Sequence, residues 1–331
     1  MAGALDGTVG APRRLDHWRD AIAEAWQARV VDRFHQRVTA LPTLGVGIST
    51  EYGAAQSTAA LDVQRLRREA PQFAGFLELG TEVLKGFDPQ AEAWLDAGLP
   101  TTYHFLDINL DEPEDFDTAW LEGLRQLLDR AKPAWLCGDA GLWHFGHREP
   151  AHMLLLPPIL TDEAATELAE GIVALREATG REVLPENPPG HVFLGDLHLL
   201  DFFARVCDRA DTGLLLDCAH LAIYQQAAGH PPQTGLDGFP LERVVEMHVA
   251  GSSLAEHDGF SWLEDDHGLD VLPETWALVR RVAAGASELR AVVLECERNS
   301  LEDCLPVYAL LDQQLAGSDF AVRCAELGLS S

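Results

Sequence analysis

The sequence lacks several features that would assign it to common classes of protein. None of its 331 residues lies in a run approaching the roughly 18 to 20 consecutive apolar residues of a membrane-spanning helix. The first residues, MAGALDGTVGAPRRLDHW, contain no apolar core of a signal peptide. The six cysteines include no C-x-x-C pair and are widely spread, so no disulfide framework is expected. We therefore expect a soluble, cytoplasmic protein.

Basic residues are also scarce. The chain has 24 Lys and Arg against 53 Asp and Glu, which gives a formal net charge of −29. An acidic surface repels phosphate groups, whereas nucleic-acid-binding proteins usually carry a basic patch. The composition therefore predicts no nucleic-acid partner and no membrane partner. Most of the acidic side chains are expected on solvated helix faces, although such a surface also suits a basic leader peptide.

Glycine-rich phosphate loops and the hydrolase nucleophile elbow are missing as well, since the chain contains no G-x-G-x-x-G, no P-loop and no G-x-S-x-G motif. Instead, short apolar segments alternate with amphipathic helical stretches, which predicts a parallel sheet with crossover helices. The predicted strands are Leu44–Ile48, Phe73–Leu79, Thr101–Leu106, Ala134–Cys137, Glu182–Glu186, Gly213–Asp217, Val244–His248 and Ala291–Glu295. Eight such units predict an α/β fold with a single (β/α)8 TIM barrel.

The chain divides into three predicted parts. Residues 1–40 form an N-terminal helical extension, which packs beneath the barrel or contacts a partner. Residues 41–318 form the barrel, and residues 319–331 form a C-terminal tail. Inside the barrel, the long segment Gly138–Thr161 carries His144, His147 and His152. Long loops in compact domains are commonly functional, so this one either covers the barrel mouth or is an exposed loop with solvated histidines.

Acidic and imidazole side chains recur where the predicted strands end. The carboxyl ends of barrel strands converge on one mouth and carry the catalytic residues. The residues concerned are His104, Asp139, Glu186, Asp217, His220, His248, Asp265, His267 and Glu295. One buried His or Asp is usually a hydrogen-bonded structural group. So many carboxylates in one small volume would repel one another and would be costly to desolvate.

Positive charge must therefore balance these carboxylates. An Arg or Lys network is one solution, but Arg298 is the nearest basic residue in the sequence. Divalent cations are the simpler solution, because mixed imidazole and carboxylate ligands suit Fe, Mn or Zn. We predict metal ligation by Glu186, Asp217, His220, His248, Asp265, His267 and Glu295, and catalytic roles for Glu186, His104 and Asp139. Cys218 and Cys296 flank predicted ligands and are expected as buried apolar groups or at the edge of the site.

The order Glu, Asp-x-x-His, His, Asp-x-His, Glu resembles that of the xylose-isomerase-like metal barrels, including their AP endonucleases. Several longer stretches more closely resemble the multinuclear non-haem iron-dependent oxidative enzymes, which include the methanobactin-biosynthesis oxidase. These stretches are LGVGIS, FLELGTE, YHF, LLLPPILTDEAA, LPENPP, GLLLD, EMHVAG, DDHG and LPETWALVRR. The resemblance covers about Leu44 to Leu311, and its strongest element is PENP combined with HVAG and a following D-x-H-G.

This resemblance implies a TIM barrel with two or three iron ions that use O2 to oxidise a residue, often cysteine, of a ribosomally made precursor peptide in natural-product biosynthesis. A partner protein or added domain often presents that peptide. By position, Glu186 is implied as a central carboxylate ligand. Asp217 and His220 are implied to bind the neighbouring ion, His248 and Glu295 to complete the pair, and Asp265 and His267 to serve the remaining ion. His104 matches the histidine of the family's strand-three motif.

Two departures from the family pattern affect the predicted number of ions. Gly80 stands where the family commonly has a histidine after strand two, and Asp139-Ala140 stands where it commonly has Glu-His. Both changes favour two ions, or one altered third site. The main alternative is a redox-inert Mn- or Zn-dependent isomerase or epimerase of a sugar-like substrate. The net charge disfavours an AP endonuclease, and a non-catalytic scaffold that has lost ligands is a further alternative.

Overall fold

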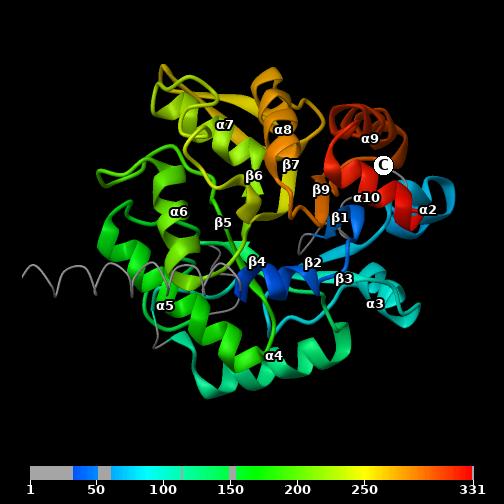
Figure 1. The fold of residues 1–331 in the computed structure, drawn as a ribbon, viewed down its shortest axis with the longest axis horizontal. Coiled ribbons are helices and arrows are strands. Elements are labelled where there is room, and N and C mark those ends of the chain that lie inside the picture. Colours follow the sequence, from blue (N-terminus) through cyan, green and yellow to red (C-terminus); the bar gives the residue numbers. More distant parts are fainter. Residues whose placement is uncertain (1–32, 51–60, 113–114, 149–153, 330–331) are drawn as a thin grey trace, which may run out of the picture.

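The computed structural model describes residues 33–50, 61–112, 115–148 and 154–329. Eight parallel strands form its centre (Figure 1). They are β1 (Gly45–Thr50), β2 (Leu77–Thr81), β3 (Thr101–Phe105), β4 (Leu136–Asp139), β5 (Val183–Glu186), β6 (Leu214–Asp217), β7 (Val244–His257) and β9 (Ala291–Glu295). The strand order β6-β5-β4-β3-β2-β1-β9-β7 is closed by pairing of β6 with β7. This closed arrangement confirms the predicted (β/α)8 barrel.

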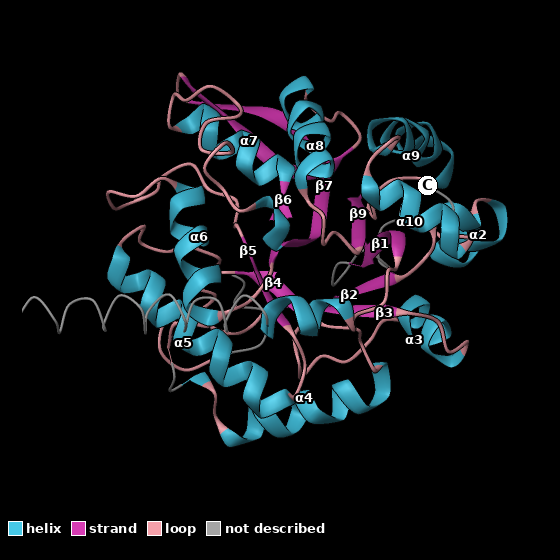
Figure 2. Ribbon diagram, viewed as in Figure 1, coloured by secondary structure: helices cyan, strands magenta, loops and turns pink. Residues whose placement is uncertain are grey.

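Helices surround the barrel on its outside (Figure 2). They are α2 (Val63–Glu69), α3 (Pro89–Asp96), α4 (Thr118–Ala131), α5 (Asp162–Thr179), α6 (Leu199–Ala210), α7 (Cys218–Ala227), α8 (Pro273–Gly285), α9 (Leu301–Leu315) and α10 (Asp319–Leu327). Helix α7 is buried on nearly every side and lacks a clear polar face, so its sequence carries little amphipathic signal. Helix α10 lies in the segment expected as a tail, and its Phe320 and Cys324 are buried in the core.

The segment after the seventh predicted strand, in which the sequence analysis placed no further strand before Ala291, forms a hairpin. Strand β7 continues to His257 and pairs antiparallel with β8 (Phe260–Gly268). The turn is Asp258-Gly259, in which both residues have positive φ. Asp-Gly is a preferred pair for such two-residue turns, so the sequence does contain the signal for this hairpin.

The described part of the N-terminal extension packs against the amino ends of the strands. Residues 33–39 are helical, and Phe34 is fully buried. Arg37 forms ion pairs of 2.8 Å with Glu182, just before β5, and 3.0 Å with Asp211, before β6. Figure 1 shows this short helix, in dark blue, lying across the barrel. The remainder of the predicted helix lies outside the described residues.

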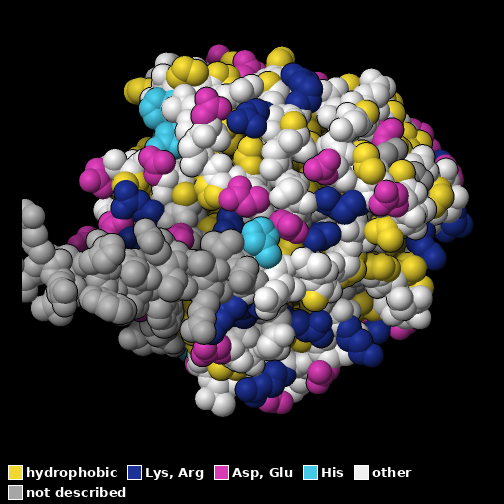
Figure 3. All heavy atoms as spheres, in the orientation of Figure 1, with side chains coloured by type: hydrophobic (Ala, Val, Ile, Leu, Met, Phe, Trp, Pro, Cys, Tyr) yellow, Lys and Arg dark blue, Asp and Glu magenta, His cyan; other side chains and the backbone are white. Residues whose placement is uncertain are grey.

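The outer surface shows no large basic region on the face in Figure 3, where acidic, basic and apolar side chains are interspersed. Within the described ranges, no helix combines the length and apolar character that crossing a bilayer demands.

Candidate metal centre

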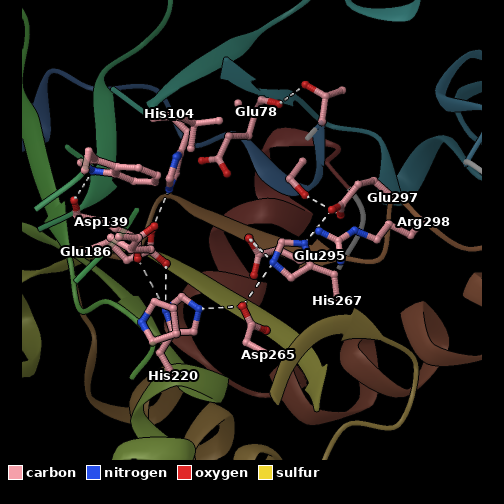
Figure 4. A pocket seen from close by; sticks show the side chains of 17 residues that line it. Glu78, His104, Asp139, Glu186, His220, Asp265, His267, Glu295, Glu297 and Arg298 are labelled. Carbon is pink, nitrogen blue, oxygen red and sulfur yellow. Dashed lines mark hydrogen bonds and ion pairs between the residues drawn. The ribbon is translucent and has the colours of Figure 1, made fainter. Parts of the chain in front are cut away.

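The predicted site residues surround one cavity at the carboxyl ends of the strands (Figure 4). The cavity has a volume of about 250 Å³. Seven of the nine predicted residues line it, namely His104, Asp139, Glu186, His220, Asp265, His267 and Glu295. Asp217 and His248 are fully buried beside it. The structure therefore brings together side chains that lie up to 191 positions apart in the sequence, from His104 to Glu295.

Strand register explains this convergence. Asp139 of β4 is aligned with Glu186 of β5, and Asp217 of β6 is aligned with His248 of β7. Aligned residues in neighbouring parallel strands point to the same face of the sheet, here the barrel interior. His220 follows on the first turn of α7, where its backbone N–H donates to Asp217 Oδ1 at 2.5 Å. The Asp-x-x-His spacing thus comes from an N-cap, which places both side chains at the mouth.

Glu186 occupies the centre of the cluster. Its Oε2 lies 2.7 Å from His104 Nε2, and its Oε1 lies 3.4 Å from His248 Nδ1 and 3.6 Å from His220 Nδ1. His248 Nδ1 also lies 3.2 Å from Glu295 Oε1. One carboxylate therefore faces three imidazoles, a position from which it can be shared between neighbouring ions.

Asp265 lies on strand β8 and lines the cavity beside His220 and His267. Its Oδ2 lies 3.1 Å from His220 Nε2 and 3.4 Å from His267 Nε2. His267 has a φ of 49°, in the left-handed region that side chains other than glycine seldom adopt. The hairpin thus supplies both members of the predicted Asp-x-His pair from a strand end, as the other strands do.

Two carboxylates of this cavity were missed by the sequence analysis. Glu297 Oε1 lies 2.6 Å from His267 Nδ1, and Glu78 Oε1 lies 3.2 Å from His248 Nε2. Both are buried. For Glu78 the signal was the two-residue period of β2, because it precedes Gly80 by two positions. Glu297 lies in the turn after β9, where that period does not apply.

The charges of the cluster do not balance by themselves. It contains seven carboxyl groups (Glu78, Asp139, Glu186, Asp217, Asp265, Glu295 and Glu297) and four imidazoles (His104, His220, His248 and His267). Even with every imidazole protonated, 7 − 4 leaves three negative charges in a buried volume. Among the described residues, Arg298 is the only Lys or Arg in the cavity lining, and counting its charge as well still leaves 7 − 4 − 1, or two, negative charges. Such an excess favours either bound cations or bound protons.

The pKa values show where protons are held when no cation is present. Burial alone would lower the pKa of His104, but its hydrogen bond to Glu186 and the charge of Glu78 raise it to about 9. Burial raises the pKa of Asp217 to about 7, although His220 opposes this change. Burial would also raise the pKa of Glu186, but His248 and His104 hold it far below its ordinary value. The cluster therefore retains protons that a divalent cation would displace.

Several buried polar atoms of the cluster lack a hydrogen-bond partner among the described residues. They include Asp139 Oδ1, Glu186 Oε1, Asp217 Oδ2, Asp265 Oδ1, Glu295 Oε2 and both ring nitrogens of His248. Buried polar atoms are normally satisfied, so unsatisfied atoms aimed at one cavity indicate a missing ligand. Oxygen and imidazole nitrogen donors suit Fe, Mn or Zn. The residues therefore fit a divalent metal centre.

The donor atoms fall into overlapping groups, each compact enough for one ion. The groups are Glu78–His248–Glu295, His104–Asp139–Glu186 and Glu186–Asp217–His220, with Glu78–Cys137–Glu246 one residue layer deeper. Glu186 belongs to two of them. This sharing supports more than one ion at the mouth of the barrel.

Gly80 shows why the family's usual histidine is missing after strand two. It is aligned with His104 in the barrel, but a Cβ at position 80 would lie 2.4 Å from the carbonyl oxygen of Thr50. Neighbouring backbone therefore occupies the space that a histidine side chain would need. At the second departure, Ala140 is buried and its N–H donates to the backbone carbonyl of Glu186.

The long loop after β4 covers one side of the cavity. Its Trp143 and Leu155 line the cavity wall. His144 is buried, with its ring nitrogens near Asp115 and the carbonyl of Gly146, so the prediction of a solvated side chain was wrong for it. His147 is exposed, as that alternative predicted, and His152 lies outside the described residues.

The six cysteines are all buried and unpaired. Cys218 and Cys296 do not line the cavity, so the expectation that they are buried apolar groups is met. Cys137, on β4, instead points toward the cluster and donates to Glu78 Oε2 at 3.2 Å.

Comparison with known proteins identifies related sequences. Residues 56–309 match the model of the family described as "RiPP precursor modification enzyme MbnB/TglH/ChrH". A UPF0276 protein from Rhizorhabdus wittichii is 30% identical over 223 residues, covering 67% of this chain and 76% of that protein. A UPF0276 protein from Caulobacter vibrioides is 30% identical over 187 residues, covering 56% of this chain and 66%, just under two thirds, of that protein.

Comparison of folds gives the same architecture. A xylose isomerase domain containing protein from Salmonella typhimurium LT2 has a TM-score of 0.50 at 13% sequence identity. The match covers 88% of this chain and 99% of that one. At this identity the similarity establishes the fold alone.

Proposed function

The chain belongs to the MbnB/TglH/ChrH family of RiPP precursor modification enzymes, and we propose on that premise that it is an iron-dependent oxidase or oxygenase of a ribosomally made peptide. RiPPs are ribosomally synthesised and post-translationally modified peptides. The observation that carries the proposal is the cluster of carboxylates and imidazoles around one cavity, whose excess negative charge and unpaired atoms suit two or three cations. The proposed co-substrate is O2.

Iron, when bound, supplies the redox chemistry with O2 that no side chain of this cluster provides. The chain's own residues fix its ligands. Glu186 lies between the groups that contain His104 and His220, and Glu297 holds the outer nitrogen of His267. A carboxylate on the outer nitrogen of a ligating histidine fixes the ring and leaves the other nitrogen free for the ion.

The cavity also limits the form of the substrate. A volume of about 250 Å³ admits one or two side chains but not a folded domain. Leu106, Trp143, Leu155 and Pro189 form an apolar part of its wall and limit access of water to a bound residue. We therefore propose that the modified residue, with cysteine as the leading candidate, enters on an extended or terminal stretch of the precursor. A partner protein that presents the precursor is part of this proposal.

The test is metal analysis and O2 consumption with protein from iron-replete cells. We expect two or three iron ions per chain, and O2 uptake that depends on a short peptide encoded beside the gene. Mass spectrometry of that peptide then reports the change of mass. Glu163→Gln, on the exposed face of α5, is the matched control for Glu186→Gln.

Two outcomes would contradict this function. No iron enrichment, with full turnover on Mn or Zn in the absence of O2, would instead support a redox-inert isomerase or epimerase. A folded chain that binds no transition metal would instead support a non-catalytic scaffold.

A further inference from the structure

Strand β8 presents an open edge beside the metal cavity. It stands last in the strand order, and within the described residues it pairs only with β7. On its other side, His191 Nε2 lies 2.6 Å from the carbonyl oxygen of Leu263. That carbonyl therefore faces away from β7, and the two-residue period of a strand makes Ser261 face the same way. Among the described residues, Ser261 has no backbone partner on this edge.

A groove runs along this edge. It has a volume of about 440 Å³ and lies between β8 and helix α7. Its walls are His191, residues 260–263 of the hairpin, and Ile223, Gln226 and Ala227 of α7. Figure 2 shows the hairpin passing beside α7. A groove with a strand edge as one wall suits an extended chain, which adds to a sheet at about 4.8 Å from its neighbour.

The groove leads toward the metal cavity. Leu263 lines the groove, and Asp265, two residues further along the same strand, lines the cavity. Two residues of a strand span about 7 Å. A chain that pairs with β8 at Ser261 therefore reaches the side chains of Asp265 and His267 once it replaces His191 at the carbonyl of Leu263.

The charge of the hairpin limits what can dock there. Residues 250–270 contain six acidic residues and no Lys or Arg. The acidic residues are Glu256, Asp258, Glu264, Asp265, Asp266 and Asp270. The segments that contribute the other wall residues, 187–198 and 218–230, also contain no Lys or Arg. Phe260 in the groove lining is 75% exposed, and Glu256, Asp258 and Glu264 of the same hairpin lie outside that lining, so negative charge flanks an apolar edge.

We propose that β8 is the docking strand for the peptide substrate, which pairs with its open edge as an extended segment bearing basic residues and so delivers the residue to be modified into the metal cavity. This inference rests on the proposed function. Backbone pairing satisfies the free groups of Ser261, basic side chains match the acidic hairpin, and apolar side chains contact Phe260 and Trp262. The same surface accounts for selection of a peptide over a sugar-like substrate, because a sugar has no backbone to pair with a strand.

The test measures binding of a fluorescein-labelled peptide of alternating Lys and Val to the metal-loaded full-length protein without O2. Ala227→Trp fills the groove without altering the hairpin, and Ala228→Trp, one residue further and outside the groove lining, is its matched control. We expect Ala227→Trp to weaken binding at least about tenfold and Ala228→Trp to leave it within about twofold. A peptide N-methylated at alternate residues should also bind at least about tenfold more weakly, since it cannot donate to the edge. A Glu-for-Lys version should bind more weakly still.

Unchanged binding with both Ala227→Trp and the N-methylated peptide would overturn the proposal. If Ala227→Trp instead converts a dimer to a monomer in sedimentation and leaves peptide binding intact, β8 is an interface between copies of this chain. Binding is measured without turnover, so the two hypotheses fail separately. Peptide binding at β8 without iron or O2 uptake would refute the proposed function alone, whereas O2-dependent modification unaffected by Ala227→Trp would refute the docking strand alone.

Discussion

Glu297 Oε1 lies 2.6 Å from His267 Nδ1, the ring nitrogen opposite the one that faces Asp265. Ser49 donates to the other oxygen of Glu297 at 3.0 Å, so the carboxylate is itself fixed. With a proton on Nδ1, the Nε2 lone pair of His267 faces Asp265 and the centre of the cluster. Glu297 is therefore a residue that positions the predicted ligand His267. Replacing Glu297 tests how much the orientation of the His267 ring contributes to metal affinity while His267 itself is retained.

We predict that Glu297→Gln lowers metal affinity about tenfold and that Glu297→Ala lowers it about a hundredfold. The Gln amide oxygen still accepts from Nδ1 but carries no charge, whereas Ala leaves the ring unsupported. Titration of the apoprotein with Fe(II) or Mn(II) under nitrogen measures both values, with Glu163→Gln as the control. Equal affinities for all four proteins would show that Glu297 has no influence on the ion.

Replacing Glu186 should reduce the metal content more than replacing a residue that belongs to only one of the donor groups. Glu186 belongs to the His104–Asp139 group and to the Asp217–His220 group. We predict that Glu186→Gln loses at least one ion per chain and all O2 uptake. The fold should remain, because the substitution also removes one negative charge from an over-acidic cluster. Elemental analysis and circular dichroism check the two statements, and full metal occupancy would remove Glu186 from the ligand set.

Most residues of the candidate metal centre could be predicted because a closed parallel barrel places the carboxyl ends of all its strands around one opening. Glu186, Asp217 and His248 each end a strand with a clear apolar pattern, so their convergence followed from the fold. Glu78 is the position of β2 two residues before Gly80, so the strand period would have indicated it, whereas Glu297 lies in the turn after β9, where no such period applies. The deeper layer with Glu246 obeys the same period relative to His248.

Other features depend on contacts that no local pattern encodes. Helix α7 follows β6 without a loop and is buried almost all round, so its sequence has little amphipathic signal. The open edge of β8 exists only because the Asp258-Gly259 turn closes a hairpin, which the pattern of eight barrel strands does not include. The groove beside it requires α7 and β8 to be neighbours, which are more than 30 residues apart in the sequence.

A pH effect on stability is expected from His198, which lies away from the metal centre. Its Nδ1 accepts the Leu200 N–H and caps α6, and its Nε2 faces Gln225 Oε1. Burial lowers the pKa of His198, with His230 stacked on the ring acting in the same direction, while Gln225 and Asp201 oppose it. The neutral ring is therefore favoured in the folded state. Its contribution to stability is present above the unfolded pKa near 6.5 and is lost as the pH falls through the folded pKa.

We accordingly predict that His198→Asn, which retains an N-cap side chain, loses less stability than the wild type between pH 7 and pH 5. Because one proton is involved, the free energy of unfolding of the two proteins can differ in its pH dependence by at most about 1.4 kcal/mol per pH unit. Urea unfolding in the presence of a chelator, at pH 5, 6 and 7, measures it without interference from bound metal. Parallel pH profiles for the two proteins would count against this role of His198.

Gly80 gives the sharpest test of the departure from the family pattern. A Cβ at this position meets the Thr50 carbonyl at 2.4 Å, and a backbone carbonyl between paired strands cannot move aside as a flexible side chain can. We predict that Gly80→Ala lowers the free energy of unfolding by about 1 to 3 kcal/mol, the usual range for overpacking. Gly238→Ala is the matched control, because a Cβ there meets nothing within 4 Å, and it should change stability by less than about 0.5 kcal/mol. Restoring the family's histidine with Gly80→His should destabilise at least as much and add no iron. A stable Gly80→His protein with one more ion per chain would contradict this prediction. It would show that the backbone of β1 at Thr50 can move aside, and that only the missing histidine side chain prevents binding of the additional ion.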